Sequence, residues 1–281
     1  MAKPSHVEFT GDDKFVAYYA EQSQSKETVE RFARIRDRAL DLWSTLNGGT
    51  VRPLDVVDIG CGAGTQAMLW AEAKHRVSAL DVNEALVSLG RKRAIQLGLD
   101  ISFDVGTAMA LPYADATADI CLLPELLEHV DDWERCLSEA IRVLRGSGVL
   151  YLSTTNKLCP RQQEFYLPLY SWYPRVVKRW CERAALTTHP EWVNHTRCPA
   201  IHWFTYFQLD RWLGRRGMTS MDRFDMLARH PQSKFRSTIV AVIRTIPPLR
   251  IAAHVASAGT TVWSVKTAAD LAVRLDRPAL Q

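Results

Sequence analysis

Residues 56–65 read VVDIGCGAGT and hold the strongest structural signal in this chain. Val56, Val57 and Ile59 predict a buried strand, which runs directly into a turn with glycine at positions 60, 62 and 64. Glycine is needed where the backbone turns sharply and lies close to a ligand, because a Cβ would collide there. Helix-compatible residues follow at 65–74, and the unpaired N–H groups of a first helical turn favour an anionic group. The stretch therefore predicts a strand–turn–helix unit that binds a ligand.

A second apolar run at 77–80 ends in Asp81, twenty-one residues after Gly60. An acid at this distance suits the two hydroxyls of a ribose. The dinucleotide fingerprint G-x-G-x-x-G would require glycine at position 65, which is Thr65. The spacing predicts an adenosine-containing cofactor and counts against a nicotinamide-dependent oxidoreductase, which stays as an alternative.

The glycine turn and the segments after it resemble the class I S-adenosylmethionine-dependent methyltransferases. The D-x-G-C-G-x-G form resembles the first motif of this family, and residues 79–83 (ALDVN) resemble the second. Residues 108–113 (AMALPY), 119–121 (DIC), 123–130 (LPELLEHV) and 143–154 (VLRGSGVLYLST) resemble the later segments in the family's order. The resemblance covers about residues 54–155. Within it, the E-x-x-E-H-V segment is similar to the ubiquinone-pathway O-methyltransferases.

Short apolar strands alternate with helical patterns from residue 55 to residue 153. With the resemblance, this predicts an α/β fold: a doubly wound, mostly parallel seven-stranded Rossmann-like sheet with an antiparallel last strand at 260–265. We expect a helix at 207–216 and the sixth strand at 217–227. Residues 1–50 are expected to form an N-terminal helical lid. Residues 51–281 would form the methyltransferase domain, with insertions at about 157–203 and 233–257.

The helical pattern at 15–46 allows two interpretations. The helix packs on the sheet edge, or it covers the cofactor and brings Arg34 or Arg38 near the cofactor's carboxylate.

The resemblance implies which residues contact S-adenosylmethionine. The glycine turn would line its methionine end, Asp81 would hold the ribose, and Val82 would flank the adenine. At Thr107 the family often has an acid that accepts the adenine amino group, and a hydroxyl accepts more weakly than a carboxylate. The expected cofactor-binding residues are Asp58, Gly60, Cys61, Gly62, Gly64, Asp81, Val82, Thr107, Ala108, Met109 and Pro124.

Glu125, Glu128 and His129 are the candidate catalytic residues, because they follow the fourth strand and can face the cofactor's sulfonium. Free histidine titrates near neutrality, so His129 suits a general base for a hydroxyl. The resemblance also permits a divalent ion such as Mg²⁺ on these three residues. A purely structural role for the segment is the third interpretation, and we predict no metal site.

A second cluster comprises His189, His195, Cys198 and His202. Its spacing fits no standard zinc pattern. His195 and His202 either line an acceptor pocket with Trp203 and Tyr206 or cap loops. Thr205 is the expected N-cap of the following helix.

Composition limits the partners and the compartment. The chain has 281 residues, a formal net charge of +4 and six dispersed cysteines without a C-x-x-C pair. These values favour a reduced, cytoplasmic protein and disfavour nucleic-acid binding. Residues 165–183 and 233–256 interleave apolar and basic side chains, and charges and the pair at 247–248 (PP) interrupt every window of transmembrane length. Both segments suit one of three roles: peripheral contact with the inner face of a membrane, an apolar acceptor pocket, or a dimer face. We expect the chain to be a monomer or a homodimer.

The leading hypothesis is a methyltransferase that uses S-adenosylmethionine to methylate a hydroxyl on an apolar, lipid-linked, glycan or secondary-metabolite small molecule. An N- or C-methyltransferase and a non-catalytic adenosine-binding scaffold are the alternatives.

Overall fold

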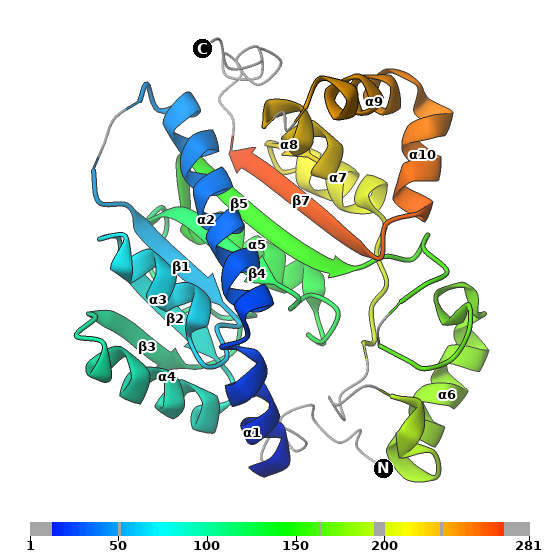
Figure 1. The fold of residues 1–281 in the computed structure, drawn as a ribbon. Coiled ribbons are helices and arrows are strands. Elements are labelled where there is room, and N and C mark those ends of the chain that lie inside the picture. The colour runs from blue at the N-terminus through cyan, green and yellow to red at the C-terminus, as the bar shows by residue number, and fades with distance from the viewer. Residues whose placement is uncertain (1–12, 50–51, 163, 194–199, 231–232, 267–281) are drawn as a thin grey trace.

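The computed structural model describes residues 13–49, 52–162, 164–193, 200–230 and 233–266. In this part of the chain seven strands form one sheet in the order β3-β2-β1-β4-β5-β7-β6 (Figure 1). Strand β7 is antiparallel to β5 and β6, whereas the other neighbouring pairs are parallel. The predicted fold class is confirmed. The strands are β1 (Asp55–Ile59), β2 (Arg76–Asp81), β3 (Ile101–Val105), β4 (Ala118–Pro124), β5 (Leu144–Thr155), β6 (Met218–Met221) and β7 (Gly259–Lys266).

Helices cover both faces of the sheet. They are α1 (Asp13–Gln22), α2 (Lys26–Leu46), α3 (Thr65–Glu72), α4 (Glu84–Gln96), α5 (Trp133–Val143), α6 (Arg175–Thr187), α7 (Tyr206–Gly214), α8 (Arg223–Arg229), α9 (Lys234–Thr245) and α10 (Pro247–Val255). Buried side chains of α2, α3 and α4 share one core with Val56 and Trp263. Those of α5 and α7 share another with Ile59 and Leu150. Because β4 is covered on both faces, its apolar run is continuous rather than alternating.

The N-terminal segment forms two helices where one was expected. Ser25 breaks the pattern, because its hydroxyl caps α2 by accepting from the backbone N–H of Thr28. Helix α2 then crosses a face of the sheet (Figure 1), burying Ile35, Leu42 and Trp43, so its predicted place on the sheet edge is wrong. An apolar stripe this wide is more completely buried on a face than on an edge.

Two further boundaries differ from the prediction. The strand expected at 217–227 ends at Met221, and residues 223–229 form α8. Asp222 and Asp225 make a reciprocal capping box that starts this helix. Strand β5 begins at Leu144 and includes the glycine turn, where Ser147 adopts a positive φ of 62°.

The insertion at about 157–203 packs its own small core beside the sheet. Phe165 and Tyr170 stack with ring centroids 4.0 Å apart. Lys178 of α6 points inward, with its ammonium 4.2 Å from the Trp203 ring centroid and 2.9 Å from the Ser171 carbonyl oxygen that accepts from it. Burial lowers the pKa of Lys178 to about 8. Among the basic residues of 165–183, Lys178 therefore packs inside the insertion rather than at its surface.

The second insertion folds into α9 and α10, bent by 110° at the proline pair. Among the described residues no single helix is long and apolar enough to span a membrane.

Candidate cofactor and acceptor site

The site lies where β1 and β4 leave the sheet side by side. The chain runs outward from β1 to β3 and returns on the other side of β1 as β4, which makes this point the topological switch of the sheet. A cavity of about 950 Å³ opens at the carboxyl ends of these strands. All but one of the predicted cofactor residues line it, and so do the three catalytic candidates. One wall is formed by α1 and α2 with Tyr18, Tyr19 and Phe32.

The glycine turn is held by strand β2. The backbone N–H groups of Gly60 and Cys61 both donate to the Leu80 carbonyl oxygen, at 2.8 and 3.0 Å. Gly60 has a φ of 77°, and a Cβ there would stand 2.9 Å from a methyl carbon of Leu126. A Cβ on Gly64 would stand 2.8 Å from Phe103. Gly64 does not line the cavity, so its glycine serves the packing of α3 on β3.

Asp81, the last residue of β2, lies beside the glycine turn. The glycine turn, Asp58, Gln66 and Asp81 are together called the cradle. The Oδ2 of Asp81 accepts from the Gly62 N–H at 2.8 Å and its Oδ1 accepts from the Asn83 N–H at 2.9 Å. Burial raises the pKa of Asp81, while these backbone donors favour its charged form. Asp81 lines the cavity, and a carboxylate has about four acceptor sites, so it can still accept from two ribose hydroxyls.

Two buried polar side chains beneath the glycine turn lack a protein partner. Asp58 is 1% exposed and Gln66 is 2% exposed. No partner with full hydrogen-bond geometry reaches the carboxylate oxygens of Asp58 or the amide atoms of Gln66 in the described chain, although the Ala67 N–H is near enough to favour the charged form of Asp58. Burial and the charge of Asp81 raise the pKa of Asp58 to about 7. Buried polar groups are normally paired, so these two predict a polar ligand in the cavity. Gln66 was missed by sequence reasoning, which stopped at the glycines.

The loop expected at the adenine edge is tightly turned. The Thr107 hydroxyl accepts from the Met109 N–H at 3.2 Å, and the Thr107 carbonyl accepts from Ala110. Both oxygens of Thr107 therefore already accept hydrogen bonds from backbone N–H groups of the same loop. Thr107, Ala108, Met109 and, across the cavity, Val82 and Pro124 all line the cavity as expected.

Glu125 stands at the exit of β4 with a positive φ of 52°. Its carboxylate pairs with the guanidinium of Arg31 on α2, an ion pair between residues that both line the cavity. In one interpretation of the sequence, Arg34 or Arg38 is the arginine of this helix that faces the cofactor. In the structure the arginine of α2 that faces the cavity is Arg31. Neither Arg34 nor Arg38 lines the cavity, and Arg34 lies within ion-pair distance of Glu30. Helical spacing identified the helix, but the arginine that faces the site depends on how α2 crosses the sheet.

Glu128 is the more buried of the two candidate catalytic acids, at 2% exposure. Its Oε2 accepts from the Thr154 hydroxyl at 2.8 Å. Burial raises the pKa of Glu128 to about 8, so the carboxyl is largely protonated at neutral pH. His129 follows in the same turn and also lines the cavity.

Glu164, which sequence reasoning did not select, lies on the same side of the cavity. Burial and the charge of Glu125 raise the pKa of Glu164 to about 7. Gln162 lines the cavity beside it and receives the backbone N–H of Glu164 on its side-chain oxygen at 2.7 Å. Both residues come from an insertion, so no motif spacing marks them.

Of the predicted second cluster, only His189 and His202 lie within the described residues, and neither lines the cavity. His189 stacks on Trp192, and Tyr206 donates to the Ser220 carbonyl at 3.2 Å, away from the cavity. His202 does not line the cavity either, whereas Trp203 does. His195 and Cys198 lie outside the described residues. No group of three or more His, Cys, Asp or Glu side chains in the described ranges is placed to hold a metal ion.

Comparisons with known proteins agree with this geometry. A family model described as "Methyltransferase domain" matches residues 57–152. Norajmaline N-methyltransferase of Rauvolfia serpentina is 32% identical over 159 residues, which are 55% of this chain and 53% of that protein. Ubiquinone biosynthesis O-methyltransferase of Rhizobium johnstonii is 32% identical over 130 residues, 45% of this chain and 52% of that protein. The chain thus spans about half the length of these curated relatives.

Among solved structures, the plantazolicin methyltransferase BpumL in complex with SAH has a TM-score of 0.56. It is 11% identical to this chain and the match covers 94% of both chains, a likeness of fold. The residues of the cradle fit S-adenosylmethionine, because Asp58 and Gln66 offer unpaired polar atoms and the glycine turn leaves room above them. Since the cradle lies within the matched segment, residues 57–152 of this chain form a domain of the class I S-adenosylmethionine-dependent methyltransferase type.

Proposed function

We propose that the protein transfers the methyl group of S-adenosylmethionine to a hydroxyl on an apolar small molecule. The observation that carries the proposal is Glu128, a buried carboxyl on the cavity wall whose pKa is raised by burial to about 8. The ionised fraction of such a carboxyl, which grows as the pH approaches about 8, is a stronger base toward a hydroxyl than an ordinary glutamate carboxylate. Aromatic side chains at the mouth of the cavity, including Phe32 and Trp203, support an acceptor with an apolar body.

The chain's own residues then have distinct roles. S-adenosylmethionine supplies an electrophilic methyl group when it is bound. Asp81 holds the ribose, Asp58 and Gln66 receive the amino group, and Arg31 exchanges its contact with Glu125 for the cofactor's carboxylate. Glu128 keeps Oε1 toward the acceptor while Oε2 stays on Thr154.

The proton of the acceptor hydroxyl goes to Glu128, or to His129 in the same turn. We further propose that α1 and the start of α2 act as a lid, because Tyr18, Tyr19 and Arg31 line the cavity from that side.

N-methylation is the second candidate, and the acidic side of the cavity favours it. Glu125, Glu128 and Glu164 line this side together, and carboxylates attract a cationic amine. The relative that methylates a nitrogen, norajmaline N-methyltransferase, fits this alternative as well as the O-methyltransferase relatives fit the first.

Calorimetric titration with S-adenosylhomocysteine beside NADH tests the cofactor. Binding of the first alone supports the proposal, and binding of NADH alone overturns it. Transfer of labelled methyl from S-adenosylmethionine is then compared between acceptors that differ only in a hydroxyl or an amine. Preference for the amine in every pair would replace O-methylation by N-methylation.

Glu128→Gln and His129→Ala separate the two candidate bases. We expect the true base variant to turn over at least about 10²-fold more slowly, with S-adenosylhomocysteine affinity nearly unchanged. Glu134→Gln, at an exposed position at the start of α5, is the matched control. Wild-type turnover in both variants would refute the assignment of a base to this segment.

A further inference from the structure

Helix α9 carries an apolar stripe that no part of the described chain covers. Phe235, Ile239 and Val242 are spaced by four and three residues, which places them on one side of α9, and Ile246 follows directly where the helix ends. Their exposed fractions are 76%, 44%, 42% and 43%, and no residue of α9 is buried. Leu249 of α10 is 43% exposed and extends the apolar surface beyond the bend. We call these five residues the hairpin stripe. Amphipathic helices normally turn such a stripe toward a core, so this one requires another partner.

The charges around the hairpin stripe are all of one sign. Residues 233–257 contain no aspartate or glutamate. Lys234 and Arg236 flank Phe235 and lie about 100° to either side of it around the helix. Both positions are exposed. The stripe is therefore bordered by cations on two sides at its N-terminal end.

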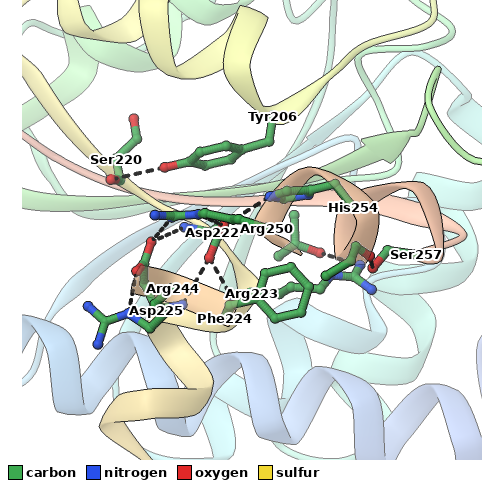
Figure 2. A network of polar contacts seen from close by, with 12 residues as sticks. Tyr206, Ser220, Asp222, Arg223, Phe224, Asp225, Arg244, Arg250, His254 and Ser257 are labelled. Atoms are coloured by element: carbon green, nitrogen blue, oxygen red, sulfur yellow. Dashed lines mark hydrogen bonds and ion pairs between the residues drawn. The ribbon is translucent and has the colours of Figure 1, made fainter. Parts of the chain in front are cut away.

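Helices α9 and α10 together are called the hairpin below. Its other two arginines, Arg244 of α9 and Arg250 of α10, have a different role. Arg244 donates to Asp225 at 2.8 Å, and Arg250 donates to Asp222 at 2.8 Å (Figure 2). His254 lies 2.9 Å from the same Asp222 oxygen. Figure 2 shows these side chains converging beneath α10. These contacts anchor α9 and α10 to the start of α8.

We propose that the hairpin stripe docks on the surface of an anionic lipid bilayer, with its apolar side chains at the boundary between headgroups and acyl chains. A short helix with an apolar side and flanking basic residues is suited to lie in this plane. Anionic headgroups attract nearby lysine and arginine side chains. A second copy of the chain would instead bring identical cations together, and residues 233–257 offer no acid to pair with them. Neither helix is long enough to span a bilayer by itself, since they have 12 and 9 residues, and the bend of 110° between them suits a pair that lies along the surface.

The test is co-sedimentation of the full-length protein with two kinds of vesicle, one of phosphatidylcholine alone and one of phosphatidylcholine and phosphatidylglycerol. We expect binding to the anionic vesicles, weakened by added salt, and little binding to the neutral ones. Phe235→Ser with Ile239→Ser should lower the partition coefficient at least about 10-fold, because each removes apolar surface from the contact. Lys234→Glu with Arg236→Glu should weaken binding to the anionic vesicles only.

Ile95→Ser is the matched control. Ile95 is 78% exposed on α4, which packs at the opposite end of the sheet (Figure 1). It should bind as the wild type does. Circular dichroism and S-adenosylhomocysteine binding confirm that every variant is folded.

Three results would overturn the proposal: equal binding to both vesicles, wild-type binding by the Phe235→Ser and Ile239→Ser variant, or absence of binding at low salt. A concentration-dependent dimer in sedimentation equilibrium, dissociated by that variant, would assign the hairpin stripe to a second copy.

Discussion

Replacing Glu128 by glutamine should make the protein more resistant to unfolding at alkaline pH. The side chain is 2% exposed, and burial raises its pKa from 4.5 to about 8. In the unfolded chain the carboxyl ionises at the lower value, so between these two values the folded state holds a proton that the unfolded state has lost. The proton-linked stability of wild type is complete below about pH 4.5 and is lost as the pH rises through about 8.

The size of the effect follows from the two pKa values. Each unit of difference corresponds to about 1.4 kcal/mol, so wild type loses at most roughly 5 kcal/mol relative to the glutamine variant across this range. Glutamine keeps the shape of the side chain, and its amide oxygen can still accept from the Thr154 hydroxyl. The difference between the two proteins should therefore grow with pH and level off above about pH 8.

Urea unfolding followed by tryptophan fluorescence, without cofactor, from about pH 5 to about pH 9 measures this difference directly. Glu125→Gln, in the same turn but exposed, shows what a change of loop charge does by itself. A stability difference between wild type and Glu128→Gln that does not change with pH would refute the raised pKa and, with it, the main support for Glu128 as a base.

Gly60→Ala should lower the free energy of unfolding by about 1–3 kcal/mol in urea denaturation, because the φ of Gly60 is positive and the new methyl would meet Leu126. At Gly62 the new methyl would meet no atom, so Gly62→Ala should lower the free energy of unfolding by only about 1 kcal/mol. Equal losses in the two variants would contradict the steric argument. Asp81→Ala should weaken S-adenosylhomocysteine binding by roughly 1.5–3 kcal/mol in calorimetry, and unchanged affinity would remove Asp81 from the ribose site. Although burial alone would raise it, bonds from His254 and other donors hold the pKa of Asp222 well below its ordinary range. Asp222→Asn should therefore destabilise the protein by about 3–5 kcal/mol near neutral pH, and this loss should shrink as the pH falls below about 4 in the same urea assay, because the unfolded wild-type chain then takes up a proton that the folded carboxylate still resists.

The part of the site that is local in sequence was predictable. The glycine turn, Asp81 and the acids after β4 each depend on one strand and the loop that follows it. Parallel strands place such loops together at one edge of the sheet, so the order of the motifs already implied a shared cavity. The helix break at Ser25 and the capping box at Asp222 had local signals too, a capping serine and paired acids, which the hydrophobic pattern concealed.

The rest of the site depends on contacts between distant segments. Arg31 reaches Glu125, 94 residues away, and helical spacing could not distinguish it from the neighbouring arginines. Glu164 becomes a cavity residue because an insertion with its own aromatic core packs beside the sheet.

By itself, the sequence determined the Rossmann-like sheet, the family and the cofactor cradle, because strand periodicity, glycine conformations and motif order are properties of short segments. Only the tertiary structure decided which arginine faces the cavity, that Glu128 is buried enough to retain its proton near neutrality, and that Arg244 and Arg250 pair with acids of α8. Burial and ion pairing depend on what packs against a residue from elsewhere in the chain, and no local pattern carries that information.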